Sequence, residues 1–164
     1  RNLATVGGSV FGRFGFSDVL TLLLVMDSYV ELYKGGIVPL ADFVNMPYDR
    51  DILVRVIVKK TAAHYSYKSV RISKTDFPVL TCAAALTQEG VQAAVGARPA
   101  KAALVKDAEQ LATLPMTAEK AQAFAEYAAG LLPTETNPRG SAAYRTHLIK
   151  VLTARCLTEL GGKA

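Results

Sequence analysis

Alternation of apolar and polar residues predicts β-strands in the first two thirds of the chain. The clearest strand covers residues 51–59, where branched apolar residues recur at every second position. Two further strands flank Gln88-Glu89-Gly90, a sequence typical of a hairpin turn. Strands are predicted over residues 3–10, 28–33, 51–59, 64–73, 79–87 and 91–95, and the first of them breaks into a turn at Gly7-Gly8.

Helical patterns dominate the C-terminal part of the chain and occur also near its beginning. Ser17 and Asp18 are strong N-cap residues that precede an apolar run, which predicts a buried helix. After residue 100, alanine and other helix formers become abundant. Helices are predicted over residues 19–26, 39–44, 106–114, 117–131 and 141–160.

This order of elements predicts an α+β fold. Short strands and a helix come first, followed by a three-stranded antiparallel sheet packed with a C-terminal helical bundle. A domain boundary is predicted near residues 60–64, which divides the chain into residues 1–60 and 61–164. No flexible linker marks that boundary.

Composition and charge restrict the classes of protein to consider. The chain has 164 residues, 51% of them hydrophobic, with 19 basic and 14 acidic side chains. Such a composition excludes a disordered tail, a collagen-like repeat and a disulfide-rich miniprotein. Because no basic run exceeds Lys59-Lys60, we expect no nucleic-acid partner. The longest apolar run, residues 19–26, is too short to cross a bilayer, so we expect no membrane partner.

Metal binding is not expected. Cys82 and Cys156 are too few for an iron–sulfur cluster or a structural zinc site, and each lies in an apolar stretch as a small buried residue would. His64 and His147 have no carboxylate or cysteine at metal-ligand spacing. A disulfide remains open, but a reducing, cytoplasmic location is the simpler inference.

One segment near the N-terminus suggests a ligand site, although no catalytic motif, P-loop or GxGxxG sequence is present. Glycines at 7 and 8 would let backbone N–H groups approach a pyrophosphate closely. Thr5 and Ser9 offer hydroxyls to phosphate oxygens, and Asp18 offers an acceptor for ribitol hydroxyls. On spacing alone, a plain Gly-Gly turn followed by a helix cap explains these residues better.

Four motifs, spread along the chain, link this segment to a known protein family. They are Arg-Asn-x-Ala-Thr-x-Gly-Gly-Ser at residues 1–9 with Ser-Asp-x-Leu at 17–20, Asp-Ile-Leu-Val-Arg-Val at 51–56, Tyr67-Lys68 with Asp76 and Ala-Ala-Ala-Leu at 83–86, and Arg-Gly-Ser-Ala-Ala-Tyr-Arg-Thr-His-Leu at 139–148. In this order they resemble the flavin subunits of the molybdenum hydroxylases, namely the xanthine dehydrogenase and carbon monoxide dehydrogenase flavoproteins. The resemblance covers nearly the whole chain.

The resemblance implies the residues that bind FAD. Those expected at the FAD phosphates are Thr5, Gly7, Gly8 and Ser9, with Gly12 in the same loop. Ser17 and Asp18 would hold the ribitol–diphosphate side, Leu53 would lie beside the isoalloxazine, and Lys68 near the ring would favour a reduced, anionic flavin. Two departures from the family are Ser9, where many relatives have Asn, and residues 13–16, where relatives have a more Pro/Ser-like stretch.

The function implied is that of a flavin-dependent oxidoreductase subunit. It would pass electrons from iron–sulfur clusters through FAD to an acceptor such as NAD. Molybdopterin and the clusters would be held by a molybdenum-cofactor subunit and an iron–sulfur subunit. Residues 1–60 would be the second half of the FAD-binding domain, and residues 61–164 the flavoprotein C-terminal domain.

The family's first FAD segment, a Gly-Gly-Thr loop, is expected upstream of Arg1, so the 164 residues alone are expected to bind FAD poorly and to be inactive. The alternative is a non-catalytic α+β assembly module of a larger complex. Flavin content distinguishes the two.

Overall fold

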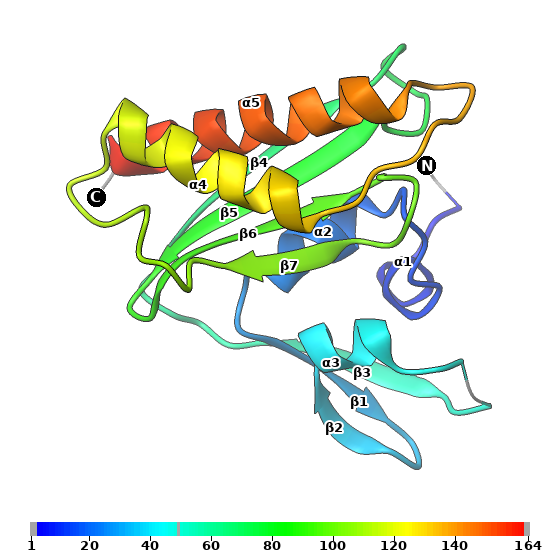
Figure 1. Cartoon of the computed structure of the whole chain (residues 1–164). Helices are drawn as coiled ribbons and strands as arrows, with labels where there is room; N and C mark the ends of the chain where they lie inside the picture. Colours follow the sequence, from blue (N-terminus) through cyan, green and yellow to red (C-terminus); the bar gives the residue numbers. More distant parts are fainter. Residues whose placement is uncertain (1–2, 49, 163–164) are drawn as a thin grey trace.

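The computed structural model describes residues 3–48 and 50–162, which form two antiparallel sheets and five helices (Figure 1). The N-terminal elements are α1 (Val6–Phe11), α2 (Asp18–Leu24), β1 (Ser28–Leu32), β2 (Gly36–Pro39), α3 (Leu40–Asn45) and β3 (Leu53–Val58). The C-terminal elements are β4 (His64–Val70), β5 (Leu80–Thr87), β6 (Gly90–Gly96), β7 (Ala103–Lys106), α4 (Ala118–Leu131) and α5 (Ala142–Gly161). The predicted α+β class is confirmed.

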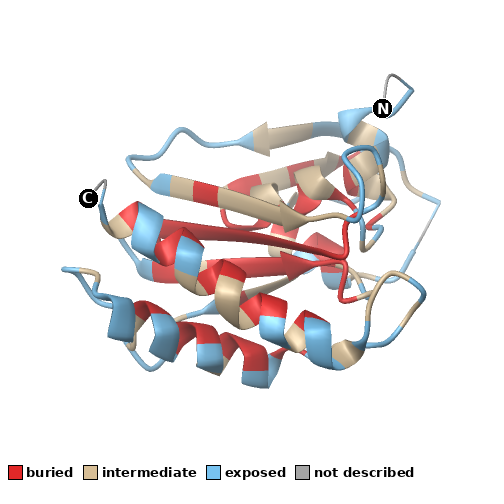
Figure 2. Ribbon diagram, turned by 90° about the horizontal axis from the view of Figure 1, so that it is seen from above, coloured by how far each residue is buried: buried red, intermediate tan, exposed pale blue. Residues whose placement is uncertain are grey.

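The larger sheet has the strand order β4-β5-β6-β7 and is covered on both faces. Helices α4 and α5 lie over one face, and α2 lies on the other (Figure 1). The central strand β5 is buried from Leu80 to Leu86, as the continuous red of the inner strands in Figure 2 shows. Its side chains alternate, so that Cys82 and Ala84 join the core under α4 and α5 while Ala83 and Ala85 join the core around α2.

The smaller sheet has the order β2-β1-β3 and packs with α3 against the core around α2. Strand β1 alternates strictly, with Val30 and Leu32 buried and Tyr29 and Glu31 half-buried. Its register pairs Ser28 with Val58 at one end and Leu32 with Leu53 at the other. The strands predicted over 28–33 and 51–59 are therefore confirmed.

Two predicted elements of the larger sheet and helical layer are wrong. The region 106–114 is not a helix: β7 ends at Lys106, and the carboxylate of Asp107 then accepts hydrogen bonds from the backbone N–H groups of Leu111 (2.9 Å) and Ala112 (2.7 Å), which close a turn. Because β7 pairs with β6, the sheet has four strands rather than the predicted three. The helices that cover it are α4 and α5, which confirm the predictions over 117–131 and 141–160.

Both cysteines are buried and free in the core under α4 and α5, as predicted for small apolar residues. A hydrogen bond to Cys156 and burial together raise the pKa of the Cys82 thiol well above its ordinary value. Within residues 3–48 and 50–162, no helix is both long enough and apolar enough to span a bilayer.

Candidate functional site

The glycine pair lies in helix α1 and not in the predicted strand and turn. Thr5 is the N-cap, and its hydroxyl accepts a hydrogen bond from the backbone N–H of Gly8 at 3.0 Å. The described glycines with positive φ are Gly36 and Gly90, so Gly7 and Gly8 are not needed for a left-handed conformation. A side-chain cap at Thr5 has overridden the low helix propensity of two consecutive glycines.

Contacts within the chain do not explain why residue 7 is glycine. A Cβ placed there would have its nearest neighbour, Leu53 Cδ2, at 4.0 Å, which is ordinary van der Waals contact. At Gly8 the added atom would lie 3.0 Å from the hydroxyl of Thr5. The backbone at Gly7 is therefore open to approach from outside the chain, which fits close approach of a phosphate group. Leu53, expected beside the isoalloxazine, borders the same surface.

Ser17 links this helix to α2. It is the N-cap of α2, where its hydroxyl accepts from Leu20 N at 3.2 Å, and it donates to the carbonyl of Ser9 at 2.9 Å. This confirms the predicted cap at Ser17, whereas Asp18 is the first residue of the helix. Gly12 lies between the two helices and packs against Phe14, because a Cβ on Gly12 would lie 2.3 Å from the Phe14 ring.

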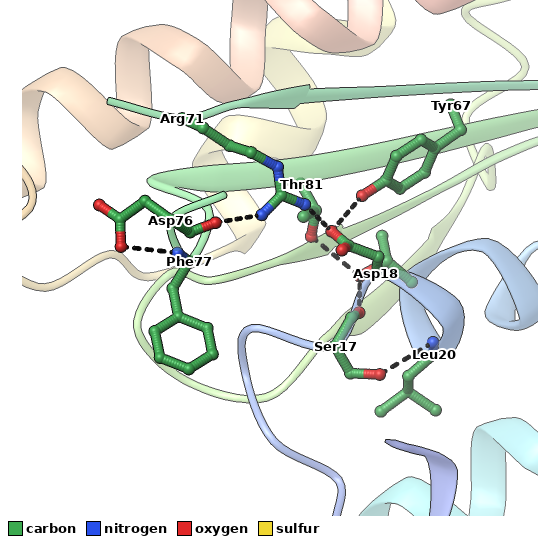
Figure 3. Close-up of polar contacts among 9 residues, drawn as sticks. Ser17, Asp18, Leu20, Tyr67, Arg71, Asp76, Phe77 and Thr81 are labelled. Atoms are coloured by element: carbon green, nitrogen blue, oxygen red, sulfur yellow. Dashed lines mark hydrogen bonds and ion pairs between the residues drawn. The ribbon is translucent and has the colours of Figure 1, made fainter. Parts of the chain in front are cut away.

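Asp18 anchors α2 to β4 (Figure 3). One carboxylate oxygen accepts a hydrogen bond from Tyr67 Oη at 2.7 Å and pairs with the Arg71 guanidinium, which also donates to Asp76 O at 2.6 Å. Burial, together with the Asp18 carboxylate, raises the pKa of Tyr67 above its ordinary value. The sequence did not identify Tyr67 or Arg71 as partners of Asp18, because the three residues meet only after α2 packs on the sheet.

Replacing Asp18 by Asn is expected to lower the free energy of unfolding by about 1–2 kcal/mol, because the Arg71 guanidinium loses a half-buried ionic partner. Urea unfolding of the flavin-free protein measures this loss. Tyr67→Phe is the matched control: it removes one hydrogen bond without removing a charge and is expected to cost about half as much. Equal stability of Asp18→Asn and the parent would contradict the anchoring role.

Lys68 is not brought together with the other predicted site residues. It is paired in register with Cys82 and lies on the face of the sheet that α4 and α5 cover. Its ammonium contacts the Glu159 carboxylate of α5 at 2.7 Å, and this hydrogen bond raises the pKa of Lys68. Gly7, Leu53 and Asp18 are associated with the opposite face, around α2.

An aromatic cluster that the sequence did not reveal borders the Asp18 anchor. Phe16 stacks parallel to Phe14 at 5.2 Å between ring centroids and contacts Phe77 at 4.3 Å. The three rings remain about half exposed. Neighbouring Arg13 is instead buried and donates to the carbonyls of Phe43 (3.1 Å) and Met46 (2.6 Å). The only signal in the sequence was the run Phe-Gly-Arg-Phe-Gly-Phe, which indicates a tight loop but not its partners.

A protein-family model described as "CO dehydrogenase flavoprotein C-terminal domain" matches residues 65–160, which is more than half of the chain. Among curated proteins, YgfM of Escherichia coli (strain K12), described as uncharacterized, is 29% identical over 155 residues. That match covers 94% of this chain and 57% of YgfM, so the chain spans little more than half the length of its relative.

Solved structures have the same fold. Carbon monoxide dehydrogenase from Hydrogenophaga pseudoflava matches with a TM-score of 0.86 and 20% identity, over 100% of this chain and 63% of that chain. Quinoline 2-oxidoreductase from Pseudomonas putida 86 matches with a TM-score of 0.80 and 22% identity, over 99% of this chain and 62% of that chain.

Proposed function

The chain belongs to the family of CO dehydrogenase flavoprotein C-terminal domains, and from this we propose that it forms part of the FAD-binding subunit of a molybdopterin-dependent dehydrogenase. Residues 1–60 would contribute to the FAD-binding domain, and residues 61–164 would form the C-terminal domain. The observation that carries the proposal is the meeting of Gly7 and Leu53 at one open surface. The resemblance assigns Gly7 to the diphosphate and Leu53 to the isoalloxazine of the same cofactor.

The residues proposed to hold FAD divide by the part of the cofactor they would contact. Thr5, Gly7, Gly8 and Ser9 would bind the phosphates, with Gly12 in the following loop. Ser17 and Asp18 would orient the ribitol side, and Leu53 would exclude water from one side of the ring. Lys68 stays a proposed ring contact on the resemblance alone, and it would have to leave Glu159 to reach the flavin.

FAD, when bound, supplies the ability to accept electrons singly or in pairs and to pass them on. The chain's own role is to bind and orient the cofactor. We propose iron–sulfur and molybdenum-cofactor subunits as electron-donating partners, an acceptor such as NAD, and a cytoplasmic location. Support for a molybdenum-cofactor partner comes from the related structures, which are a carbon monoxide dehydrogenase that lacks the Mo-pyranopterin moiety of its molybdenum cofactor and a quinoline 2-oxidoreductase. A protein that purifies without flavin would instead support the assembly module.

Replacing Gly7 by Ala tests the proposed phosphate contact. The added methyl group has room in the apo-protein, and alanine favours a helix over glycine, so the free energy of unfolding is expected to stay equal or to rise by up to about 1 kcal/mol. The same methyl group would hold a pyrophosphate away from the backbone N–H groups. Loss of one charged hydrogen bond is expected to weaken FAD binding about 10- to 100-fold.

The measurement combines flavin fluorescence titration of the intact protein with thermal unfolding in the absence of flavin. Gly130→Ala is the matched control, because Gly130 is exposed in α4 and a Cβ there has no neighbour within 4 Å. It is expected to leave FAD affinity unchanged. Parental FAD affinity in Gly7→Ala would remove α1 from the proposed site.

A further inference from the structure

Two cations in and just after β4 contact different layers of the fold. Tyr67 packs against the core around α2, and successive side chains of a strand point to opposite faces. Lys68 lies on the other face, where its ammonium contacts the Glu159 carboxylate of α5. Arg71, which directly follows β4, lies again on the α2 side and pairs with Asp18 (Figure 3). Arg71 is therefore a cation on the side of the sheet where the flavin site is proposed.

The loop between β4 and β5 holds the Arg71 guanidinium from the other direction. One guanidinium nitrogen donates to the carbonyl of Asp76 at 2.6 Å, while the other terminal nitrogen pairs with Asp18. The loop is closed at its base by a backbone hydrogen bond from Val79 N to Val70 O at 2.8 Å. The Arg71 side chain is 14% exposed. Its position is therefore set by the loop as well as by the carboxylate.

The Asp18 carboxylate is oriented and still accessible. Its Oδ1 atom accepts from the Tyr67 hydroxyl at 2.7 Å and pairs with Arg71, so two side chains determine its orientation. The Asp18 side chain nevertheless remains 23% exposed. A carboxylate has two oxygens with about four lone-pair sites, so these two contacts do not exhaust its capacity as an acceptor. Asp18 also directly follows Ser17, whose hydroxyl donates to the carbonyl of Ser9 in α1 at 2.9 Å.

Electrostatics explains why an arginine at this position would serve a flavin site. FAD carries an anionic diphosphate, and an uncompensated carboxylate near the proposed phosphate segment would repel it. The Arg71 guanidinium compensates that charge without removing the acceptor oxygens of Asp18. The fork of an arginine also donates to a carboxylate and to a carbonyl at once, in a fixed geometry that the ammonium of a lysine does not provide.

We propose that Arg71 is a positioning residue of the flavin site. It holds the Asp18 carboxylate in the orientation that accepts hydrogen bonds from the ribitol hydroxyls of FAD, and it compensates the charge of that carboxylate. Arg71 acts through Asp18 and does not itself contact the cofactor. The inference rests on the proposed function and adds a residue that the resemblance does not name, since the basic residue assigned there is Lys68.

Titrations of the intact protein with FAD and with ADP test the proposal, because ADP has the diphosphate but lacks the ribitol and the ring. Flavin fluorescence measures FAD binding, and competition with FAD measures ADP binding. Arg71→Met is expected to weaken FAD binding about tenfold and to leave ADP affinity within about twofold of the parent. Equal loss of affinity for both ligands would show a general loosening around α2 and would overturn the proposal.

A double substitution shows whether Arg71 acts through Asp18. In an Asp18→Asn background, Arg71→Met is expected to change FAD affinity by less than about twofold, because the carboxylate that Arg71 orients is gone. A further loss of about tenfold in that background would mean that Arg71 acts on the cofactor directly, which contradicts a positioning role. A parent protein that binds no FAD would overturn the proposed function itself, and this inference with it.

Two single variants complete the set. Arg71→Lys keeps the charge but not the fork, so its FAD affinity is expected to fall between parent and Arg71→Met, about threefold below the parent. Lys150 pairs with Glu126 between α5 and α4, and Lys150→Met is expected to change the affinity for neither ligand. Circular dichroism without flavin establishes that each variant is folded. Parental FAD affinity in Arg71→Met, or in Arg71→Lys where the methionine variant does not fold, would refute the assignment.

Discussion

Replacing Arg145 by Met is expected to lower the free energy of unfolding by about 3–5 kcal/mol, one of the two largest effects anticipated for a single substitution. Arg145 is 1% exposed. Its guanidinium donates to the carbonyls of Val79 (3.0 Å), Glu135 (2.6 Å) and Gly140 (2.5 Å) and to Asn137 Oδ1 (2.6 Å). Methionine fills much of the space but donates to none of these four acceptors, and Asn137 Oδ1 and Gly140 O keep only the backbone N–H groups of Arg139 and Asn137 as donors. The connection between α4 and α5 and the start of β5 then lose their common anchor.

Chemical unfolding monitored by circular dichroism measures this loss. Arg155→Met is the matched control, because Arg155 lies exposed on the same helix, and it is expected to change stability by less than about 0.5 kcal/mol. Burial lowers the pKa of Arg145, although an arginine remains charged at neutral pH. Arg145→Lys should therefore keep the charge but lose the fork of donors and fall between parent and Met. A loss below about 1 kcal/mol in Arg145→Met would contradict the anchoring role.

Replacing Gly15 by Ala is expected to cost about 3 kcal/mol, because two backbone segments approach too closely for any side chain. A Cβ on Gly15 would lie 2.3 Å from Pro99 O and 2.6 Å from Ala100 O. The approach is held by a hydrogen bond from Ala97 N to Gly15 O at 2.6 Å. The overlap involves carbonyl oxygens of the main chain, so rotation of a side chain cannot relieve it.

The same unfolding measurement on Gly15→Ala and Gly7→Ala compares two glycines of one segment in the absence of flavin. At residue 7 the nearest neighbour of the added carbon is at 4.0 Å, so that variant is expected to be at least as stable as the parent. A similar, small effect at both positions would show that the loop of residues 12–16 can move away from residues 97–101.

Strict alternation and strong caps could be read from the sequence, because each acts over a few residues. Strand β1 and the cap at Ser17 are examples. The glycine pair was misassigned, because the hydroxyl of Thr5 secures a helix that propensity alone disfavours. Strand β7 is not predicted, because its short sequence lacks a clear period and only pairing with β6 determines its conformation; the helix predicted over 106–114 begins at its last residue.

The candidate site could be predicted only as a set of residues, not as a shape. The contact of Leu53 with the surface over Gly7 depends on how α1 packs beside β3. The position of Lys68 relative to the other site residues could not be predicted either. It is next to Tyr67 in sequence, but successive residues of a strand point to opposite faces, so the two side chains enter different layers.

The central strand β5 belongs to both cores, and this bears on how such a protein can be recombined with its relatives. Its three consecutive alanines pack against α4 and α5 on one side and against the core around α2 on the other. A crossover near residue 60 would transfer the sheet without the helix that covers its second face. Gly96 requires close packing between the sheet and α2, since its backbone lies against Thr21 of α2 with no room for a Cβ. The sheet and α2 therefore form one packing unit, and a functional chimera would have to exchange both.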